Sequence, residues 1–172
     1  MTTHNRTNVA CAVIDSLVKN LKYPKLKWCI SDDRSDEGHV DKLVEQFKKN
    51  SINEVHVEKT NKERYGLGAS LNNGLKYAWT NSDIVLTTED DWILEKPLNI
   101  IQHVKIIESD KTIAAIRLAT LNYAAERKCI YDDFVEVYSN GKLYSVFNNQ
   151  VALRHKRIYD KLSYYKDNCS SD

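Results

Sequence analysis

The sequence has few glycines and prolines, few cysteines and no long apolar run. Five glycines and two prolines among 172 residues leave no stretch that resembles a linker, so we expect a single domain over residues 1–172. A membrane-spanning helix needs about 18 or more consecutive apolar residues, and no run of that length is present. The start of the chain, MTTHNRTN, also lacks the apolar core of a signal peptide. We therefore expect a cytoplasmic protein without a transmembrane segment.

The sequence also lacks a metal-binding cysteine pattern and an excess of charge of one sign. The four cysteines form no C-x-x-C pair and the five histidines are scattered, so we expect free thiols and no zinc site. The net charge of +1 gives no overall field that would attract a nucleic acid, and we expect no such partner. The function must therefore be sought in local motifs.

Helical and strand spacing of apolar residues alternate through the first 110 residues. Helices are predicted over residues 7–21, 40–47, 71–79 and 98–109. Strands are predicted over residues 26–31, 54–58, 83–88 and 112–120. This alternation is typical of an α/β fold with a mostly parallel central sheet flanked by helices, in which ligands bind beyond the carboxyl ends of the strands. After residue 120 we expect an irregular, mixed half, with a hairpin over 134–147 around Asn140-Gly141 and a helix over 156–162.

Three adjacent acids end a predicted strand in DIVLTTEDDWIL, residues 83–94. Carboxylates this close repel one another, and burial adds a desolvation cost, so a positive group should lie nearby. Because residues i and i+2 of an extended segment share a face, Glu89 and Asp91 can point the same way while Asp90 points elsewhere. Two such ligands suit Mg²⁺ or Mn²⁺, which keep further positions for water and phosphate. The alternative is a solvated acidic turn.

A second acid pair, Asp32-Asp33, follows another predicted strand in CISDDRSDEG, residues 29–38. Two strands of one half-sheet that both end in acids predict a single polar cleft at the carboxyl edge. The alternative is that Asp32 or Ser35 caps the helix that starts near Gly38.

Glycines cluster at the start of another predicted helix, within residues 63–79. Gly66 and Gly68 are not part of a dinucleotide-binding G-x-G-x-x-G motif, because Leu71 stands in the place of the third glycine. The glycines here, Gly74 included, are explained by close approach of the backbone to a ligand or a neighbouring element, or equally by a loop without a functional role.

Four motifs follow one another within residues 3–97. They are THNR (3–6), ISDDRSDEG (30–38), RYGLGASLNNGL (64–75) and VLTTEDDWIL (85–94). In order and spacing they resemble the T-x-N-R, D-D-x-S, N-x-G-x-x-x-A-R-N-x-G and D-x-D motifs of family-2 glycosyltransferases of the GT-A fold. The resemblance implies that residues 1–97 bind a nucleotide-diphosphate sugar and that residues 98–172 form the acceptor and catalytic half. The short chain is also similar to small glycosyltransferases of archaeal viruses, which implies the host cytoplasm.

The resemblance implies roles for individual residues. Asp91 and Glu89 would bind the metal ion, Mn²⁺ or Mg²⁺, which bridges the diphosphate and neutralises the leaving group. The residues implied to bind the donor are Thr3, Asn5, Arg6, Asp32, Asp33, Asn72, Glu89 and Asp90. Asp33 matches the acid that contacts the nucleobase, but it does not separate UDP from GDP donors. The acceptor is expected to be a glycan or a protein.

The sequence departs from the family pattern in two places. Only Met1 and Thr2 precede the first motif, so the first strand of the family is truncated or replaced. Leu71 and Arg64 stand where the family has arginine and asparagine, so the basic run at residues 154–157 becomes a candidate for contacts to the diphosphate. The alternative for this run is a solvated face.

An inverting transferase needs a carboxylate that takes the proton of the acceptor. The resemblance points to the end of the chain, where the candidates are Asp172 and Asp167, with the pair Asp132-Asp133 as a further possibility. We therefore expect a metal-dependent, inverting glycosyltransferase. One alternative is a module of the same fold that binds without turnover. Another is a metal-dependent phosphoryl-transfer enzyme or nuclease, against which the lack of a P-loop and of a basic surface counts.

Overall fold

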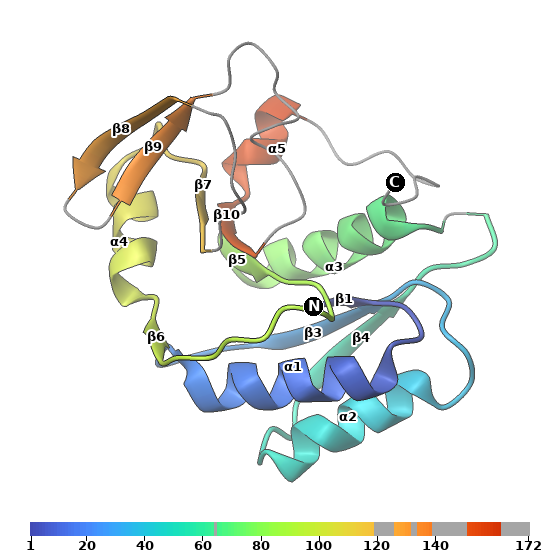
Figure 1. Ribbon diagram of the computed structural model, residues 1–172. Helices are drawn as coiled ribbons and strands as arrows, with labels where there is room; N and C mark the ends of the chain where they lie inside the picture. Colours follow the sequence, from blue (N-terminus) through green and yellow to red (C-terminus); the bar gives the residue numbers. More distant parts are fainter. Residues whose placement is uncertain (64, 119–125, 132–133, 139–150, 163–172) are drawn as a thin grey trace.

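The computed structural model describes residues 1–63, 65–118, 126–131, 134–138 and 151–162 (Figure 1). In chain order its elements are β1 (Thr2–Thr3), α1 (Thr7–Asn20), β2 (Leu21–Lys22), β3 (Trp28–Asp32), α2 (His39–Lys49), β4 (Val55–Lys59), α3 (Leu67–Asn81), β5 (Ile84–Thr87), β6 (Leu98–Asn99), α4 (Ile101–Ser109), β7 (Ala115–Arg117), β8 (Glu126–Tyr131), β9 (Phe134–Tyr138), β10 (Ala152–His155) and α5 (Arg157–Leu162). Among these described residues, no helix combines the length and the apolar character needed to cross a membrane.

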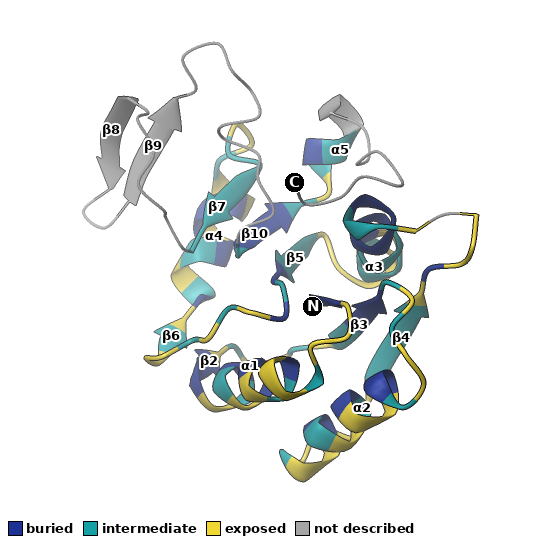
Figure 2. Ribbon diagram, turned by 45° about the vertical axis from the view of Figure 1, so that its right-hand side comes forward, coloured by how far each residue is buried: buried dark blue, intermediate teal, exposed yellow. Residues whose placement is uncertain are grey.

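The first half of the chain forms a parallel sheet with the strand order β1-β3-β4. Thr2 pairs with Ser31 and Trp28 pairs with Val55, and both pairings are parallel. Helices α1 and α2 cover one face of this sheet, and α3 covers the other (Figures 1 and 2). The predicted alternation of strands and crossover helices is confirmed here, and it brings the carboxyl ends of the strands to one edge.

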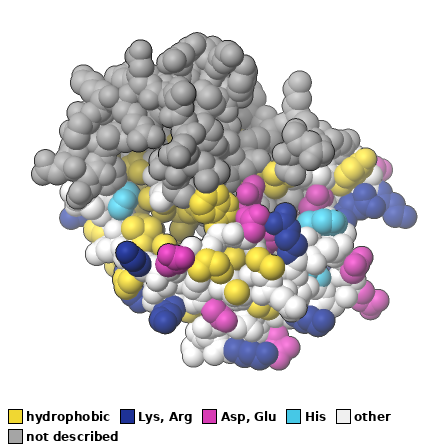
Figure 3. Space-filling view, viewed as in Figure 1, with side chains coloured by type: hydrophobic (Ala, Val, Ile, Leu, Met, Phe, Trp, Pro, Cys, Tyr) yellow, Lys and Arg dark blue, Asp and Glu magenta, His cyan; other side chains and the backbone are white. Residues whose placement is uncertain are grey.

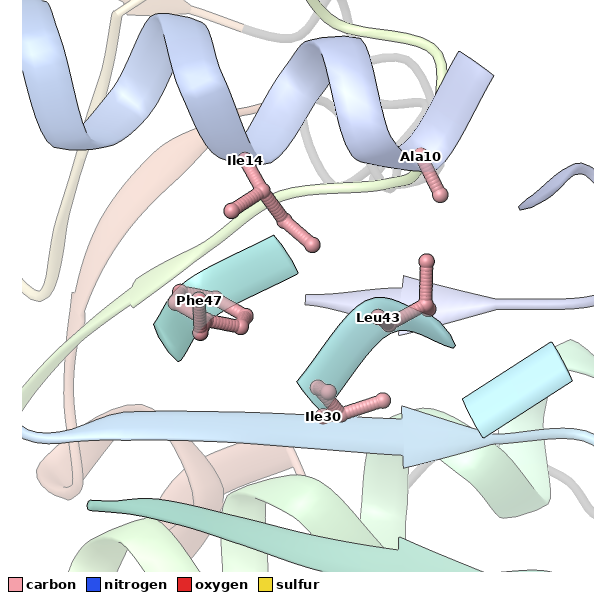
Figure 4. Close-up of a cluster of buried hydrophobic side chains, with 5 residues drawn as sticks. All are labelled: Ala10, Ile14, Ile30, Leu43 and Phe47. Carbon is pink, nitrogen blue, oxygen red and sulfur yellow. The ribbon is translucent and has the colours of Figure 1, made fainter. Parts of the chain in front are cut away.

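The hydrophobic core between the sheet and helices α1 and α2 shows which face of each helix is buried. Ala10 and Ile14 of α1, and Leu43 and Phe47 of α2, pack with Ile30 of β3 (Figure 4), and all five are at most 2% exposed. The residues of each helical pair are four positions apart, so they share one face of their helix. The apolar spacing in the sequence therefore determines which face of each helix is buried.

On the other face of the sheet, α3 lies unusually close to β3. A Cβ atom added at Gly74 would lie 3.0 Å from Cβ of Ser31. The hydroxyl of Ser70 donates to the backbone oxygen of Ser31 at 2.9 Å, so the helix and the strand are also joined by a polar contact. Of the two interpretations of the glycine cluster, close approach to a neighbouring element holds for Gly74.

The second half of the chain contains a sheet with the order β5-β10-β7, in which both pairings are antiparallel. The strand predicted over 112–120 is present as the shorter β7. Strand β10 is not predicted from the sequence, because its four residues, ALRH, do not alternate between apolar and polar side chains. The sheet of β1, β3 and β4 is thus parallel, and that of β5, β10 and β7 is antiparallel.

Only the first strand of the hairpin predicted over 134–147 lies in the described part of the chain. Residues 134–138 form that strand, β9, which pairs antiparallel with the preceding strand β8. Residues 139–147, with Asn140-Gly141, lie outside the described part of the chain, so the turn expected there stays a prediction. Helix α5 confirms the helix predicted over 156–162.

A cavity of about 350 Å³ lies between β3 and β5. Because β1 contains only two residues, it accompanies β3 and β5 only near their carboxyl ends. The cavity is lined by residues of both strands, among them Trp28, Cys29, Ile84 and Leu86. Strand β1 therefore joins the two half-sheets over a short length.

Replacement of Leu43 by alanine should destabilise the protein by about 2–5 kcal/mol, because a fully buried side chain is lost and a cavity remains. Urea unfolding followed by circular dichroism measures this change. The control is Val9→Ala on α1, where the side chain is 44% exposed, and we expect a change below about 0.5 kcal/mol. Equal effects of the two substitutions would contradict the packing described here.

Candidate functional site

Three chain segments meet at the carboxyl edge of the parallel sheet. They are residues 3–6 after β1, residues 32–38 after β3 and residues 88–91 after β5. The backbone nitrogen of Thr2 donates to the oxygen of Thr88 at 3.0 Å, and that of Asp33 donates to the oxygen of Thr3 at 2.9 Å. The two acid clusters therefore flank β1 on either side, and their predicted position at one edge is confirmed.

The middle acid of the triplet points inward. Asp90 is 3% exposed, and its Oδ2 accepts hydrogen bonds from the hydroxyl of Thr3 at 2.8 Å and from the backbone nitrogen of His4 at 3.1 Å. Asp91 is exposed, and its Oδ2 lies 2.7 Å from Nη1 of Arg6. Asp90 and Asp91 lie in a turn after the bridge at Glu89, and Oδ1 of Asp90 lies 3.6 Å from the same Nη1 of Arg6, so the shared face expected for Glu89 and Asp91 stays a prediction.

The charges of the outer acids are balanced unequally. Burial, followed by the proximity of Asp91, raises the pKa of the Glu89 carboxyl above its usual value, although a hydrogen bond with Trp92 acts in the opposite direction. The hydrogen bond to Asp91 raises the pKa of Arg6, so that pair is mutually compensated. The surroundings of Glu89 therefore disfavour its negative charge.

The donor set of the triplet fits a hard divalent cation with incomplete protein ligation. Glu89 and Asp91 supply carboxylate oxygens, the ligand type that Mg²⁺ and Mn²⁺ prefer. In the part of the chain that the structure describes, no group of three or more His, Cys, Asp or Glu side chains is placed to hold a metal ion. A cation at these two acids would take its other ligands from water and from phosphate oxygens, as Mg²⁺ commonly does.

The acids after β3 hold the loops around the edge. Oδ1 of Asp33 accepts from the hydroxyl of Thr60 at 2.9 Å and from the backbone nitrogen of Gly66 at 2.8 Å. Asp32 is 2% exposed and accepts from the backbone nitrogen of Ser35. The N-cap of α2 is Gly38, which has no side-chain capping hydrogen bond, so the helix-capping alternative for Asp32 and Ser35 is wrong.

The other residues expected to bind the donor lie in different environments. The exposed Asn5 accepts from the backbone nitrogen of Asp36 at 2.7 Å through its side-chain oxygen. Thr3 is 4% exposed, and Asn72, within α3, is 1% exposed. Of the predicted set, the structure brings Thr3, Asn5, Arg6, Asp32, Asp33, Glu89, Asp90 and Asp91 together at the edge. Asn72 lies in the helix behind it.

Arg154, Lys156 and Arg157 of the basic run at 154–157 contact other parts of the chain. Nζ of Lys156 lies 2.7 Å from Oδ1 of Asp83, which precedes β5 and so lies at the end opposite the acids. The guanidinium of Arg157 donates to the backbone oxygen of Asp110, just after α4, at 3.0 Å. The buried Arg154 donates to the hydroxyl of Thr87 at 3.0 Å, so its side chain alone of these three reaches the carboxyl end of β5.

Sequence reasoning missed His39, which is 3% exposed at the start of α2. Its Nε2 lies 2.8 Å from the hydroxyl oxygen of Thr3, and its Nδ1 lies 2.7 Å from that of Thr7. A signal was present, because His39 is spaced by four residues from Leu43 and by eight from Phe47 and so continues the buried face of α2. The candidate bases Asp172, Asp167, Asp133 and Asp132, as well as Arg64, lie outside the described residues.

The face of the molecule shown in Figure 3 carries acidic, basic and histidine side chains next to one another, beside a group of hydrophobic side chains. The mixture of signs agrees with the ion pair of Arg6 with Asp91 and with the net charge of +1. Such a surface carries no broad positive field, so the recognition of a ligand here depends on the individual groups at the edge.

The comparisons with known proteins agree with this geometry. The family described as "Glycosyl transferase family 2" matches residues 1–151. Among curated proteins, none matches the sequence. Among solved structures, the chain is similar to the mannosyltransferase PcManGT from Pyrobaculum calidifontis in complex with GDP-Man and Mn²⁺, with a TM-score of 0.65 and 17% identity. The match covers 96% of this chain and 46% of that protein, so this chain spans about half its length. The likeness confirms the expected GT-A fold.

Replacement of Glu89 by glutamine should raise the melting temperature at pH 7 when EDTA is present. The folded protein raises the pKa of this carboxyl, so it binds the proton more tightly than the unfolded chain does, and ionisation at neutral pH opposes folding. The difference between wild type and variant should shrink as the pH falls through the raised pKa toward the usual value. The control is Glu95→Gln at an exposed position. A variant that is less stable than wild type at pH 7 without metal would contradict this assignment.

Proposed function

Since this chain belongs to glycosyl transferase family 2, we propose that it transfers a sugar from a nucleotide-diphosphate sugar to an acceptor, with the help of a divalent metal ion. The observation that carries the proposal is that residues 3–6, 32–38 and 88–91 meet at one edge of the sheet. The hydroxyl of Thr3 there donates a hydrogen bond to Asp90. GDP-Man and Mn²⁺ in the similar mannosyltransferase support a donor of the GDP type, while the UDP type stays open.

In this proposal Glu89 and Asp91 hold Mn²⁺ or Mg²⁺. The ion, when bound, neutralises the negative charge that develops on the leaving diphosphate. The two acids are suited to it because they supply oxygen ligands while leaving coordination positions for the donor. Arg6, which faces Asp91 in the free protein, lies where its guanidinium can also contact phosphate oxygens.

The remaining residues orient the donor. Thr60 and Gly66 hold Oδ1 of Asp33, which fixes the carboxylate so that Oδ2 can accept a hydrogen bond from the nucleobase. The side-chain oxygen of Asn5 holds the loop after β3 through Asp36. Asp32, Thr3 and Asp90 are buried, and we assign them to the shape of the site beneath the donor. Asn72 contributes from α3 behind it.

We assign residues 1–97 to the donor and residues 98–172 to the acceptor, which we expect to be a glycan or a protein. An inverting reaction requires a carboxylate on the side of the sugar opposite the diphosphate, where it accepts the proton of the acceptor hydroxyl. The candidates remain Asp172, Asp167 and Asp133. Inversion, the cytoplasmic location and the viral origin also stay predictions.

The donor and the metal are tested together by Asp91→Asn. We expect one nucleotide sugar of the GDP or UDP type, with Mn²⁺, to raise the melting temperature of the wild type, because a ligand that binds only the folded state at 100 times its Kd stabilises it by about 2.7 kcal/mol. The shift should vanish with EDTA and in Asp91→Asn. The control is Asp83→Asn, which breaks another exposed ion pair of the same length, 2.7 Å, at the other end of β5.

If Asp91→Asn still showed a metal-dependent shift in melting temperature, the metal would not bind at the acid triplet. No shift with any GDP or UDP sugar would refute the proposed donor class. Binding without transfer to any acceptor in a broad glycan panel would indicate a module that binds without turnover.

The catalytic base is tested by Asp172→Asn, Asp167→Asn and Asp133→Asn in turn. One of the three should lower kcat by about 100-fold or more, because general base catalysis contributes about that much, while donor binding stays unchanged. Transfer is followed by mass spectrometry of the acceptor, and donor binding by calorimetry. Full activity in all three variants would show that the base lies elsewhere.

A further inference from the structure

His39 is the centre of a buried chain of hydrogen bonds that ends at the acid triplet. The chain runs from Thr7 through Nδ1 and Nε2 of His39 to Thr3, and from Thr3 to Asp90, with separations of 2.7, 2.8 and 2.8 Å. The four residues come from α1, α2, β1 and the segment after β5. Three of them, His39, Thr3 and Asp90, are less than 5% exposed, so water does not readily replace these bonds.

The direction of each hydrogen bond follows from the number of protons. Thr3 donates its single hydroxyl proton to Oδ2 of Asp90. Thr3 can then only accept from His39, which places a proton on Nε2. Burial lowers the pKa of His39, despite the opposing influence of Asp32 and Asp90, so the neutral ring with a bare Nδ1 is favoured at neutral pH. The hydroxyl of Thr7 then donates to Nδ1.

We propose that His39 is a positioning residue for the metal site: by donating to Thr3 it fixes the hydroxyl that holds Asp90, and so sets the directions of Glu89 and Asp91 on either side. The carboxylate of Asp90 ties its segment to Thr3 and to the backbone of His4. If it left this position, the backbone that carries Glu89 and Asp91 would lose that anchor. The inference rests on the proposed function for its metal and goes beyond it in naming a residue that does not touch the donor.

A histidine at this position does more than fill the start of α2. An apolar side chain would satisfy the buried face shared with Leu43 and Phe47, but it would leave the Thr3 oxygen without its donor. Threonine alone cannot define the bond, since a free hydroxyl rotates among several acceptors. The donor from His39 removes that freedom and leaves the proton of Thr3 directed at Asp90.

Two amide variants distinguish the contribution of Nε2 of His39 from that of Nδ1. In His39→Gln the side-chain nitrogen can reach the place of Nε2 and donate to Thr3. In His39→Asn the side chain is one methylene shorter, so its amide lies near the place of Nδ1 and can reach Thr7 but not Thr3. Both are uncharged amides that differ by one methylene, which makes them matched variants. Thr7→Val removes the distal bond and serves as the control.

The first measurement does not depend on the metal. The amide proton of His4 is bonded to Oδ2 of Asp90, so its NMR chemical shift and its exchange rate report where that carboxylate lies. We expect both to stay near the wild-type values in His39→Gln and Thr7→Val, and to change in His39→Asn with faster exchange. An unchanged His4 amide in His39→Asn would overturn the proposal.

The second measurement is the affinity for Mn²⁺ in the presence of GDP or UDP, followed by the electron paramagnetic resonance of free Mn²⁺. Loss of a residue that orients metal ligands commonly lowers metal affinity about 10- to 100-fold, and we expect this in His39→Asn but less than about 3-fold in His39→Gln. Equal losses in both variants, or none in either, would overturn the proposal. Absence of Mn²⁺ binding in the wild type would refute the proposed function instead, and the His4 amide would still decide whether His39 positions Asp90.

Discussion

The hydrogen bond from Thr3 to Asp90 is the contact on which the arrangement of the site depends. Strand β1 has two residues, and through it the parallel sheet meets the segment that follows β5. Backbone nitrogens of Thr2 and His4 also donate across this junction, to Thr88 and Asp90, and the cavity between β3 and β5 lies beside it. A hydrogen bond to a buried carboxylate contributes about 1.5–3 kcal/mol. Its loss would therefore affect both the junction and the acids.

The triplet shows how one short segment can carry three negative charges. Each acid is compensated differently: Asp90 by two hydrogen bonds in a buried position, Asp91 by an exposed ion pair with Arg6, and Glu89 by little more than a bond with Trp92. The raised pKa of Glu89 indicates that positive charge placed beside this carboxylate would stabilise the fold. That place coincides with the position at which the proposed function requires a cation.

The sequence predicted those features that are set locally. The buried faces of α1 and α2 follow from apolar spacing, and the acids appear at the edge because parallel strands end there. The pairing of β9 and the existence of β10 could not be derived in this way. Burial of Leu153 and Arg154 depends on β5 and β7, which are distant in the sequence. His39 was overlooked because, in the sequence, it is only one of five scattered histidines. Its hydrogen bonds are formed with Thr3 and Thr7, which are more than 30 residues away in the sequence.

The ion pair of Arg6 with Asp91 bears on how a metal enters the proposed site. The two side chains are 56% and 42% exposed, and exposed pairs of this kind contribute only about 0–1 kcal/mol. In the proposed site, a divalent cation at Asp91 and Glu89 would take the place of Arg6 at Asp91 and would also neutralise Glu89, whose charge is disfavoured by burial. Arg6 then retains its charge beside a bound diphosphate, where a guanidinium can form two parallel hydrogen bonds. Because Arg6 is exposed, a cation can replace it at Asp91. The buried Asp90 meanwhile keeps residues 88–91 in place through its bonds with Thr3 and His4.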